Sequence, residues 1–185
     1  LNAEVRGTSI VYHNYFDIGV AIGSGKGLVV PVLRNAEHMS FAQVELTIAE
    51  FARRAKENKL KLDELQGGTF SITNFGSFGS LFATPVINQP QVAILGAGAV
   101  EKQPVVVDGD AIAIRSMAHL ALTFDHRLID GSEAVQFLVS IKNAIEDPQR
   151  LIAVTREHDP VERLRRCLVS TDLNSISKTL DALHR

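Results

Sequence analysis

The stretch AHLALTFDHRLIDGSEAVQFLVSIKNAIE, residues 118–146, decides the fold. Its first seven residues alternate apolar and polar side chains, a pattern typical of a β-strand. The segment from Ser132 to Glu146 carries apolar residues every three or four positions, which predicts an amphipathic helix that Asp147-Pro148 ends. We expect its inward side chains to be Val135, Leu138, Ile141 and Ile145. A strand and a helix joined by a short charged turn indicate an α/β architecture.

The rest of the core repeats this alternation of strands and helices. A second helix is predicted after Ser40, which forms a capping-box pattern with Gln43. Its buried stripe is predicted to be Phe41, Val44, Ile48, Phe51 and Ala55. Short β-prone runs lie at 9–13, 18–22, 28–33, 69–73 and 92–95, and a hairpin is predicted over 105–114 around Asp108-Gly109. The expected fold is a two-layer sandwich of mixed β-sheet with helices packed on it.

Composition changes near residue 151. Beyond it there is no glycine or phenylalanine, and Asp159-Pro160 gives a helix-start signal. We therefore expect a core domain over 1–151 and a helical appendage over 152–185. Because the sequence begins with Leu1 rather than Met, we also expect it to be part of a longer or processed chain.

Charge and composition exclude several classes of function. The 185 residues include 19 basic and 21 acidic ones, a net charge of −2. Such a balance predicts no nucleic-acid partner and no membrane surface as partner. No apolar run approaches the roughly 18 residues of a membrane span. The single cysteine, Cys167, excludes an intramolecular disulfide and a cysteine-rich metal site.

The charged turn 125–131, DHRLIDG, is the first candidate site. His126 follows the end of an apolar strand, where scaffolds expose catalytic groups, and a histidine there is available as a base near neutral pH. Asp130 could orient its ring or pair with an arginine. A plain strand-terminal turn with locally paired charges is the alternative. A metal site is not predicted, because His126 and Asp130 supply two ligands and the spacing gives no third.

A second candidate is the run GGTFSITNFG at 67–76. A hydroxyl at the end of a strand, beside a glycine-bearing loop, can donate to an oxyanion. The alternative is that threonine only suits the strand and Asn-x-Gly the turn. The run GSGKG at 23–27 has the wrong spacing for a phosphate-binding loop and is read as a hairpin turn.

Taken together, five ordered segments resemble the catalytic domain of the 2-oxo acid dehydrogenase E2 components, the dihydrolipoamide acyltransferases. They are GLVVPVLRNAE (27–37), GGTFSITNFGSFG (67–79), TPVINQPQVAILG (84–96), DHRLIDG (125–131) and EDPQRL (146–151). This resemblance covers essentially residues 1–151 and implies a fold like that of chloramphenicol acetyltransferase.

The resemblance implies a reaction and its residues. An acyl group moves from the thiol of dihydrolipoamide to the thiol of coenzyme A, which is a substrate here. His126 is implied as the general base that deprotonates the coenzyme A thiol, and Thr73 as the hydroxyl that stabilises the oxyanion. Asp130 is the acidic residue of the histidine motif, and its partner stays open between the imidazole and an arginine such as Arg127.

It also implies partners. Family members form homotrimers with each active site between two subunits, and the trimers assemble into larger hollow cores. The lipoyl group, and the domains that bind the E1 and E3 components, lie upstream in complete members and are expected to be absent from this chain, as is the first part of the catalytic domain. The implied location is the cytoplasm of a bacterium or the mitochondrial matrix.

The transferred acyl group is predicted to be succinyl. The segments YHNYFD (12–17) and GSLFATP (79–85) are most similar to the succinyl-transferring members of the family, although Phe75 stands where that branch usually has glycine. Three alternatives stay open at this point: an acetyl- or branched-chain-transferring relative, an enzyme of the chloramphenicol acetyltransferase type, and a catalytically silent assembly core.

Overall fold

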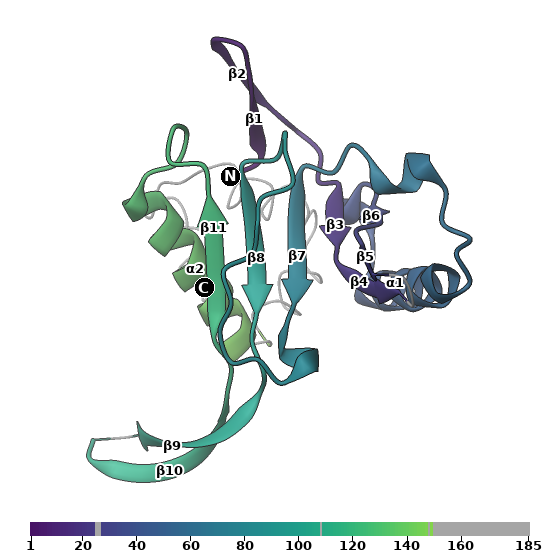
Figure 1. Ribbon diagram of the computed structural model, residues 1–185. Helices are drawn as coiled ribbons and strands as arrows, with labels where there is room; N and C mark the ends of the chain where they lie inside the picture. Colours follow the sequence, from purple (N-terminus) through teal and green to yellow (C-terminus); the bar gives the residue numbers. More distant parts are fainter. Residues whose placement is uncertain (25–26, 108, 148, 150–185) are drawn as a thin grey trace.

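The computed structural model describes residues 1–24, 27–107, 109–147 and 149. In this part of the chain, a five-stranded sheet carries two long helices and three outlying two-stranded pairs (Figure 1). The predicted helical appendage at 152–185 lies outside the described residues.

The central sheet is mixed. From one edge to the other its strands are β11 (Leu120–Phe124), β8 (Ala93–Ala97), β7 (Phe70–Asn74), β3 (Ile18–Val20) and β6 (Val32–Leu33). The outlying pairs are β1 (Ala3–Arg6) with β2 (Ser9–Tyr12), β4 (Ile22–Ser24) with β5 (Gly27–Val29), and β9 (Glu101–Val107) with β10 (Ala111–Met117). The helices are α1 (Phe41–Lys56) and α2 (Gly131–Glu146), with short 3-10 turns η1 (Ala36–His38), η2 (Leu62–Leu65) and η3 (Gly76–Phe78). Strand β7 runs parallel to β3 and β8, whereas β11 and β6 are antiparallel to their neighbours.

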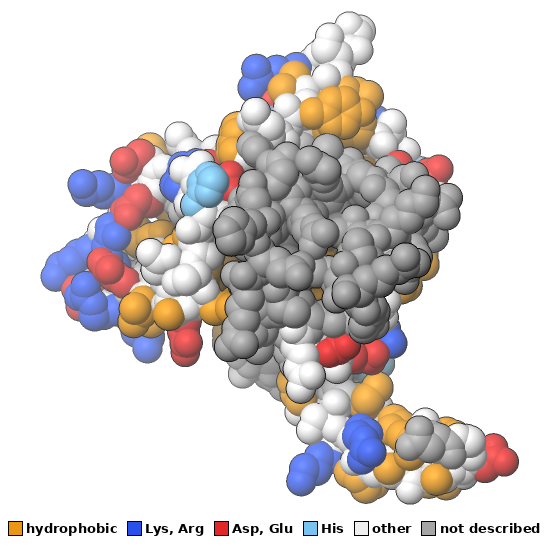
Figure 2. Space-filling model, turned by 180° about the vertical axis from the view of Figure 1, so that it is seen from behind, with side chains coloured by type: hydrophobic (Ala, Val, Ile, Leu, Met, Phe, Trp, Pro, Cys, Tyr) orange, Lys and Arg blue, Asp and Glu red, His pale blue; other side chains and the backbone are white. Residues whose placement is uncertain are grey.

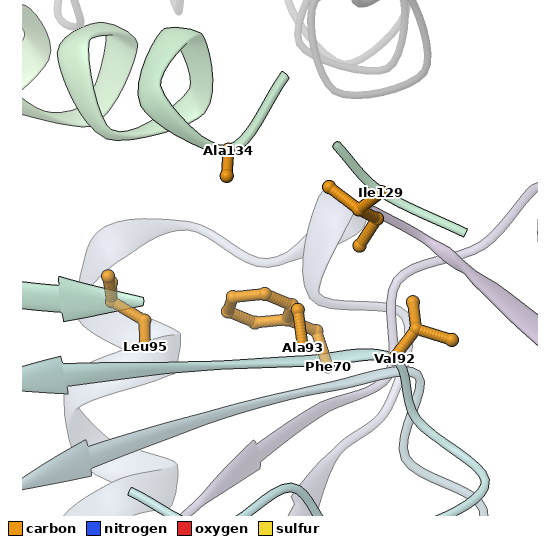
Figure 3. Close-up of a cluster of buried hydrophobic side chains, with 6 residues drawn as sticks. All are labelled: Phe70, Val92, Ala93, Leu95, Ile129 and Ala134. Carbon is orange, nitrogen blue, oxygen red and sulfur yellow. The ribbon is translucent and has the colours of Figure 1, made fainter. Parts of the chain in front are cut away.

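Both helices cover the same face of the sheet. One core cluster, drawn in Figure 3, joins the sheet to α2 through Phe70, Val92, Ala93, Leu95, Ile129 and Ala134. A second cluster joins α1 to the β4 and β6 region through Ile22, Leu33, Phe51 and Ala55. Ile18 of β3 packs against both clusters, and side chains on a strand alternate between faces, so the two helices share one layer. The predicted two-layer sandwich is therefore confirmed.

The buried face of each helix differs from the predicted one. On α2, Ala134 is buried, and Phe137, Leu138 and Ile141 pack beside it, while Val135 and Ile145 are 60% and 62% exposed. The small side chain of Ala134 allows the helix to approach the sheet closely. The packed stripe therefore begins at Ala134, one position before the stripe that the larger apolar residues predicted. On α1, Phe51 and Ala55 are buried as predicted, but Phe41 is 64% exposed because the packed stripe begins only with Val44.

Two predicted strands are each divided in two. The run 18–22 breaks at Ala21, whose backbone N–H donates to Ile72 O at 2.8 Å, and β4 then leaves the central sheet. The run 28–33 breaks at the buried Pro31, which has no N–H to give to a ladder. As a result β5 pairs with β4 in a hairpin, while β6 returns to the sheet beside β3.

Other local predictions are confirmed. Ser40 caps α1 in a capping box with Gln43. Strands β9 and β10 pair in antiparallel register around the predicted turn, from Ala111 opposite Val107 to Met117 opposite Glu101. This β9–β10 arm projects from the body of the molecule (Figure 1).

Candidate active site

The turn that follows β11 places His126 at one end of the sheet. The backbone N–H of Asp125 donates to Val92 O at 2.8 Å, and the N–H groups of Leu128 and Ile129 both donate to Asp125 O at 3.0 Å. Ile129 is only 4% exposed and anchors the turn in the α2 core. His126 thus stands on a hydrogen-bonded turn, with its ring 5.5 Å from that of Phe124 between centroids.

Arg127 is paired with Asp125. Its Nη2 lies 2.6 Å from Asp125 Oδ2 and its Nε 3.0 Å from Oδ1, so the guanidinium binds the carboxylate in a fork. The hydrogen bond from Arg127 lowers the pKa of Asp125 below its usual value, and the same contact raises the pKa of Arg127. Arg127 is therefore held within its own turn by Asp125. It is not the partner of Asp130 in this structure, although the sequence left that pairing open.

Asp130 begins helix α2. Its Oδ1 accepts hydrogen bonds from the backbone N–H of Ser132 at 3.0 Å and of Glu133 at 3.3 Å, and from the Ser132 hydroxyl at 2.7 Å. Glu133 completes a capping box by accepting from the N–H of Asp130. The Ser132 hydroxyl is the main cause that lowers the pKa of Asp130, and the charge of His126 is the smallest. The carboxylate is thus a helix cap within electrostatic range of the imidazole.

An open pocket of about 550 Å³ lies beside His126. Its walls come from three separated parts of the chain: Val5 on β1, the segment with Ile87, Gln89, Pro90, Gln91 and Val92, and the turn with Phe124, Asp125, His126 and Arg127. The volume falls within the range of roughly 300–1,000 Å³ that is usual for small-ligand sites. Five of these ten residues are apolar, so the pocket places apolar and polar walls in equal number beside one imidazole.

Thr73 lies at the other end of the sheet. It pairs with Gly96 near the C-terminal end of β8, whereas Phe124 of β11 pairs with Ala93 at the start of β8. His126 follows two residues beyond Phe124, so at about 3.3 Å per residue the two levels differ by at least roughly 10 Å along the strands. In Figure 1, β7 and β8 run downward to one end, and the turn after β11 is at the opposite end. A single chain therefore does not bring Thr73 and His126 together.

The backbone around Thr73 is tightly packed. After β7 the chain turns through η3, where Asn74 Oδ1 accepts from Ser77 N at 3.1 Å. Glycine is required at position 76, because a Cβ there would lie 2.3 Å from the backbone carbon of Gly98. Within the part of the chain that the structure describes, no hydrogen bond engages the Thr73 hydroxyl. It is therefore available as a donor on a rigid support.

The wall formed by residues 87–92 was not predicted as part of a site. Gln91 is 6% exposed and accepts a hydrogen bond from the Ser71 hydroxyl at 2.7 Å, which fixes this wall against β7. Its segment was noticed in the sequence only through the resemblance. Nothing in its pattern shows that it approaches His126, because that contact depends on the pairing of β8 with β11.

Neither a metal-binding cluster nor a membrane-spanning helix occurs among the described residues. No group of three or more His, Cys, Asp and Glu side chains is arranged there to hold a metal ion. In the same residues, neither helix is long and apolar enough to span a bilayer.

Comparison with known proteins identifies the family. The model of the 2-oxoacid dehydrogenases acyltransferase (catalytic domain) family matches residues 1–153, and the chain belongs to this family. Among curated relatives, the dihydrolipoyllysine-residue succinyltransferase component of the 2-oxoglutarate dehydrogenase complex from Cupriavidus necator is 59% identical over 152 residues, and that from Pseudomonas aeruginosa is 56% identical. These alignments cover 82% of the chain but only 36% and 37% of the relatives.

Solved structures agree with this assignment. A probable dihydrolipoamide acetyltransferase from Listeria monocytogenes matches with a TM-score of 0.77 and 41% identity, over 80% of this chain and 62% of that one. The dihydrolipoamide acetyltransferase of Azotobacter vinelandii matches with a TM-score of 0.78 and 37% identity, over 82% and 63%. The predicted family and fold are confirmed.

Proposed function

We propose that this chain is the catalytic part of an acyltransferase that moves a succinyl group between dihydrolipoamide and coenzyme A in a 2-oxo acid dehydrogenase complex. The curated relatives at 50–59% identity carry the succinyltransferase name, whereas the two structures named as dihydrolipoamide acetyltransferases match at 41% and 37% identity. These identities favour succinyl over acetyl as the transferred group.

The separation of His126 and Thr73 is the observation on which the proposed site between two subunits rests. Each stands at its own end of the sheet, so one chain does not bring His126 and Thr73 into the same site. In an assembly, His126 of one subunit would face Thr73 of its neighbour, and the site would form at the boundary. At such a boundary, the His126 end of one sheet meets the Thr73 end of the next. The two substrates can then enter from opposite sides, as a direct transfer between two bound thiols requires.

The proposed chemistry needs one base and one hydrogen-bond donor. A thiol with a pKa of about 8.5 is mostly protonated at neutral pH. His126 takes the proton of the coenzyme A thiol, and the thiolate attacks the carbonyl carbon of the thioester. Thr73 donates to the oxygen that becomes negative. When the dihydrolipoamide thiolate leaves, it receives the proton from His126. The base is worth roughly 10²–10⁴ in rate and the donor roughly 10²–10³.

Asp130 acts in this proposal as a positioning residue. Its cap fixes the start of α2, and thereby the turn that carries His126. Its charge favours the imidazolium that exists while the proton resides on His126. The pocket beside His126, with Val5, Ile87 and Pro90 among its apolar walls, suits the thiol-bearing arm of coenzyme A. The lipoyl group is expected to arrive on a domain outside this chain.

The β9–β10 arm supports assembly into a homotrimer. Residues 104, 106, 112 and 114 lie on one face of this two-stranded ribbon, and Val106, Ile112 and Ile114 are 68%, 75% and 59% exposed. Figure 2 shows apolar side chains along the arm. Because an isolated two-stranded ribbon is marginally stable in water, we expect a neighbouring subunit to cover it.

Larger assembly and location follow the relatives. One solved neighbour, at 36% identity and a TM-score of 0.78, is described as the cubic core of a pyruvate dehydrogenase multienzyme complex. We expect the trimers of this protein to form a larger core, and its E1 and E3 partners to bind through segments outside this chain. The first relatives are bacterial, and we place the protein in the bacterial cytoplasm.

The test is succinyl transfer from succinyl-coenzyme A to free dihydrolipoamide by the assembled chain. We expect turnover that falls by roughly 10²–10⁴ in His126→Ala, as for loss of a general base. His38→Ala is the matched control, because the His38 side chain is 71% exposed in η1 and does not line the pocket, and it should keep full activity. Absence of transfer by the wild-type chain, or full turnover in His126→Ala, would contradict the proposal.

A further inference from the structure

The aromatic ring of Phe75 occupies the sheet surface beside Thr73. A Cβ added at Gly96 would lie 2.5 Å from Cε1 of Phe75 and 3.2 Å from Cγ of Pro85. The ring thus fills the space that a side chain at position 96 would need. Glycine at this position leaves room for the edge of the ring against β8.

Gly96 is the cross-strand partner of Thr73. The neighbouring pair, Ile72 and Leu95, points into the core beneath α2, so Thr73 and position 96 face the other side of the sheet. Adjacent strands are about 4.8 Å apart, which puts the Phe75 ring within roughly one strand spacing of the Thr73 side chain on that same face.

The backbone holds the ring in this place. The N–H of Phe75 donates to Ala97 O at 3.1 Å, and Phe75 O accepts from Phe78 N at 3.2 Å. The close approach of Gly76 to Gly98 prevents the loop from moving toward β8. Phe75 is therefore a wall beside Thr73 whose backbone is held in place by hydrogen bonds.

If the proposed function is correct, this wall must contact the acyl group. An oxyanion that accepts a hydrogen bond from Thr73 lies about 3 Å from the hydroxyl, so the carbons attached to that carbonyl lie within a strand spacing of it. A ring at that distance takes the space that a branch close to the carbonyl would need, whereas a linear chain can extend past it. We propose that Phe75 is a specificity-determining residue that restricts the enzyme to linear acyl groups such as succinyl.

The experiment compares kcat/KM for succinyl-, acetyl- and isobutyryl-coenzyme A with dihydrolipoamide, in the assembled full chain. One methylene in an apolar pocket changes discrimination by roughly 10–200-fold, so we expect Phe75→Ala to raise the isobutyryl-to-succinyl ratio at least about tenfold. Phe75→Leu, which keeps the loop better packed, should raise it less. Phe78→Ala is the matched control, because Phe78 belongs to the same loop and is 83% exposed.

The outcomes separate the two proposals. An unchanged ratio in both Phe75 variants that still transfer succinyl would overturn the role of Phe75 and leave the acyltransferase function standing. An equal change in Phe78→Ala would also overturn it, because the loop as a whole would then be responsible. Failure of the wild-type chain to transfer any of the three acyl groups would overturn the proposed function, and the role of Phe75 with it.

Discussion

At the scale of single residues, the charged side chains of the turn 125–131 have two different roles, an ion pair within the turn and a cap of helix α2. Asp125 and Arg127 neutralise each other within the turn, while Asp130 caps α2 and lies within electrostatic range of His126. The sequence pointed to His126 and Asp130 as candidates, but it left the partner of Asp130 open. That partner depends on how α2 leaves the turn, and the spacing of charged residues contains no information about this angle.

Substitutions at Asp130 can separate the cap from the charge. Asparagine caps helices about as well as aspartate, whereas alanine does not. We expect Asp130→Asn to keep the melting temperature near that of the wild type, and Asp130→Ala to lower it measurably. Both should reduce kcat at least roughly tenfold, because each removes the charge that favours the imidazolium. Wild-type turnover in a stable Asp130→Asn would show that the carboxylate serves only as a cap.

At the scale of elements, an ion pair fastens α1 to the segment that leads into β7. Arg54 Nη1 lies 2.7 Å from Glu64 Oε1, and Glu64 Oε2 also accepts from Lys61 N at 2.9 Å. These contacts, with the Arg54 hydrogen bond as the largest cause, lower the pKa of Glu64 to about 2. Residues 62–65 thus close the loop between α1 and β7.

The lowered pKa of Glu64 gives a pH dependence with a defined sign. Its folded-state pKa is below the unfolded value, so its stabilisation is present above about pH 4.5 and is lost as the pH falls toward 2. We expect the urea midpoint to decrease between pH 5 and 3, and to decrease less in Glu64→Gln. The difference should be modest, because solvent screens exposed ion pairs.

Glu45→Gln is the matched control for this measurement. It removes an exposed carboxylate of α1, the helix that carries Arg54, and no ion pair of Glu45 occurs in the described part of the chain. Its pH profile should follow the wild type. Equal slopes in the wild type, Glu64→Gln and Glu45→Gln would contradict the assignment of this pH dependence to Glu64.

How far the sequence predicts this fold is clearest element by element. The cap at Ser40 and the turn of the β9–β10 arm were predictable, because local hydrogen bonds and turn chemistry determine them. The inward face of α2 was predicted only in part: Leu138 and Ile141 pack against the core as expected, whereas Ala134 became a core residue through close packing and Val135 stayed exposed. Strand order and register were not predictable either, because they depend on packing between distant segments. For that reason the residues pointed to His126 and to the run 67–76, and the family resemblance to Thr73, but the sequence did not place the two at opposite ends of the sheet.

At the scale of the whole molecule, the exposed arm and the separation of His126 from Thr73 both agree with the proposed assembly of subunits. A lone subunit exposes the apolar face of the β9–β10 arm to water. It also keeps His126 and Thr73 apart, at opposite ends of the sheet. Contact between subunits would resolve both at once, because it covers the arm and completes the site. Activity should therefore depend on assembly.

Mixed assembly of two inactive variants tests this central claim most directly. Chains with His126→Ala and chains with Thr73→Ala should each be nearly inactive alone. When they are co-folded in equal amounts and mass spectrometry shows mixed oligomers, each boundary has an even chance of an intact His126 and an even chance of an intact Thr73. About one quarter of the boundaries in a cyclic assembly then hold both residues, and we predict activity approaching that fraction of the wild type. Mixed oligomers that remain as inactive as the single variants would contradict an active site shared between subunits.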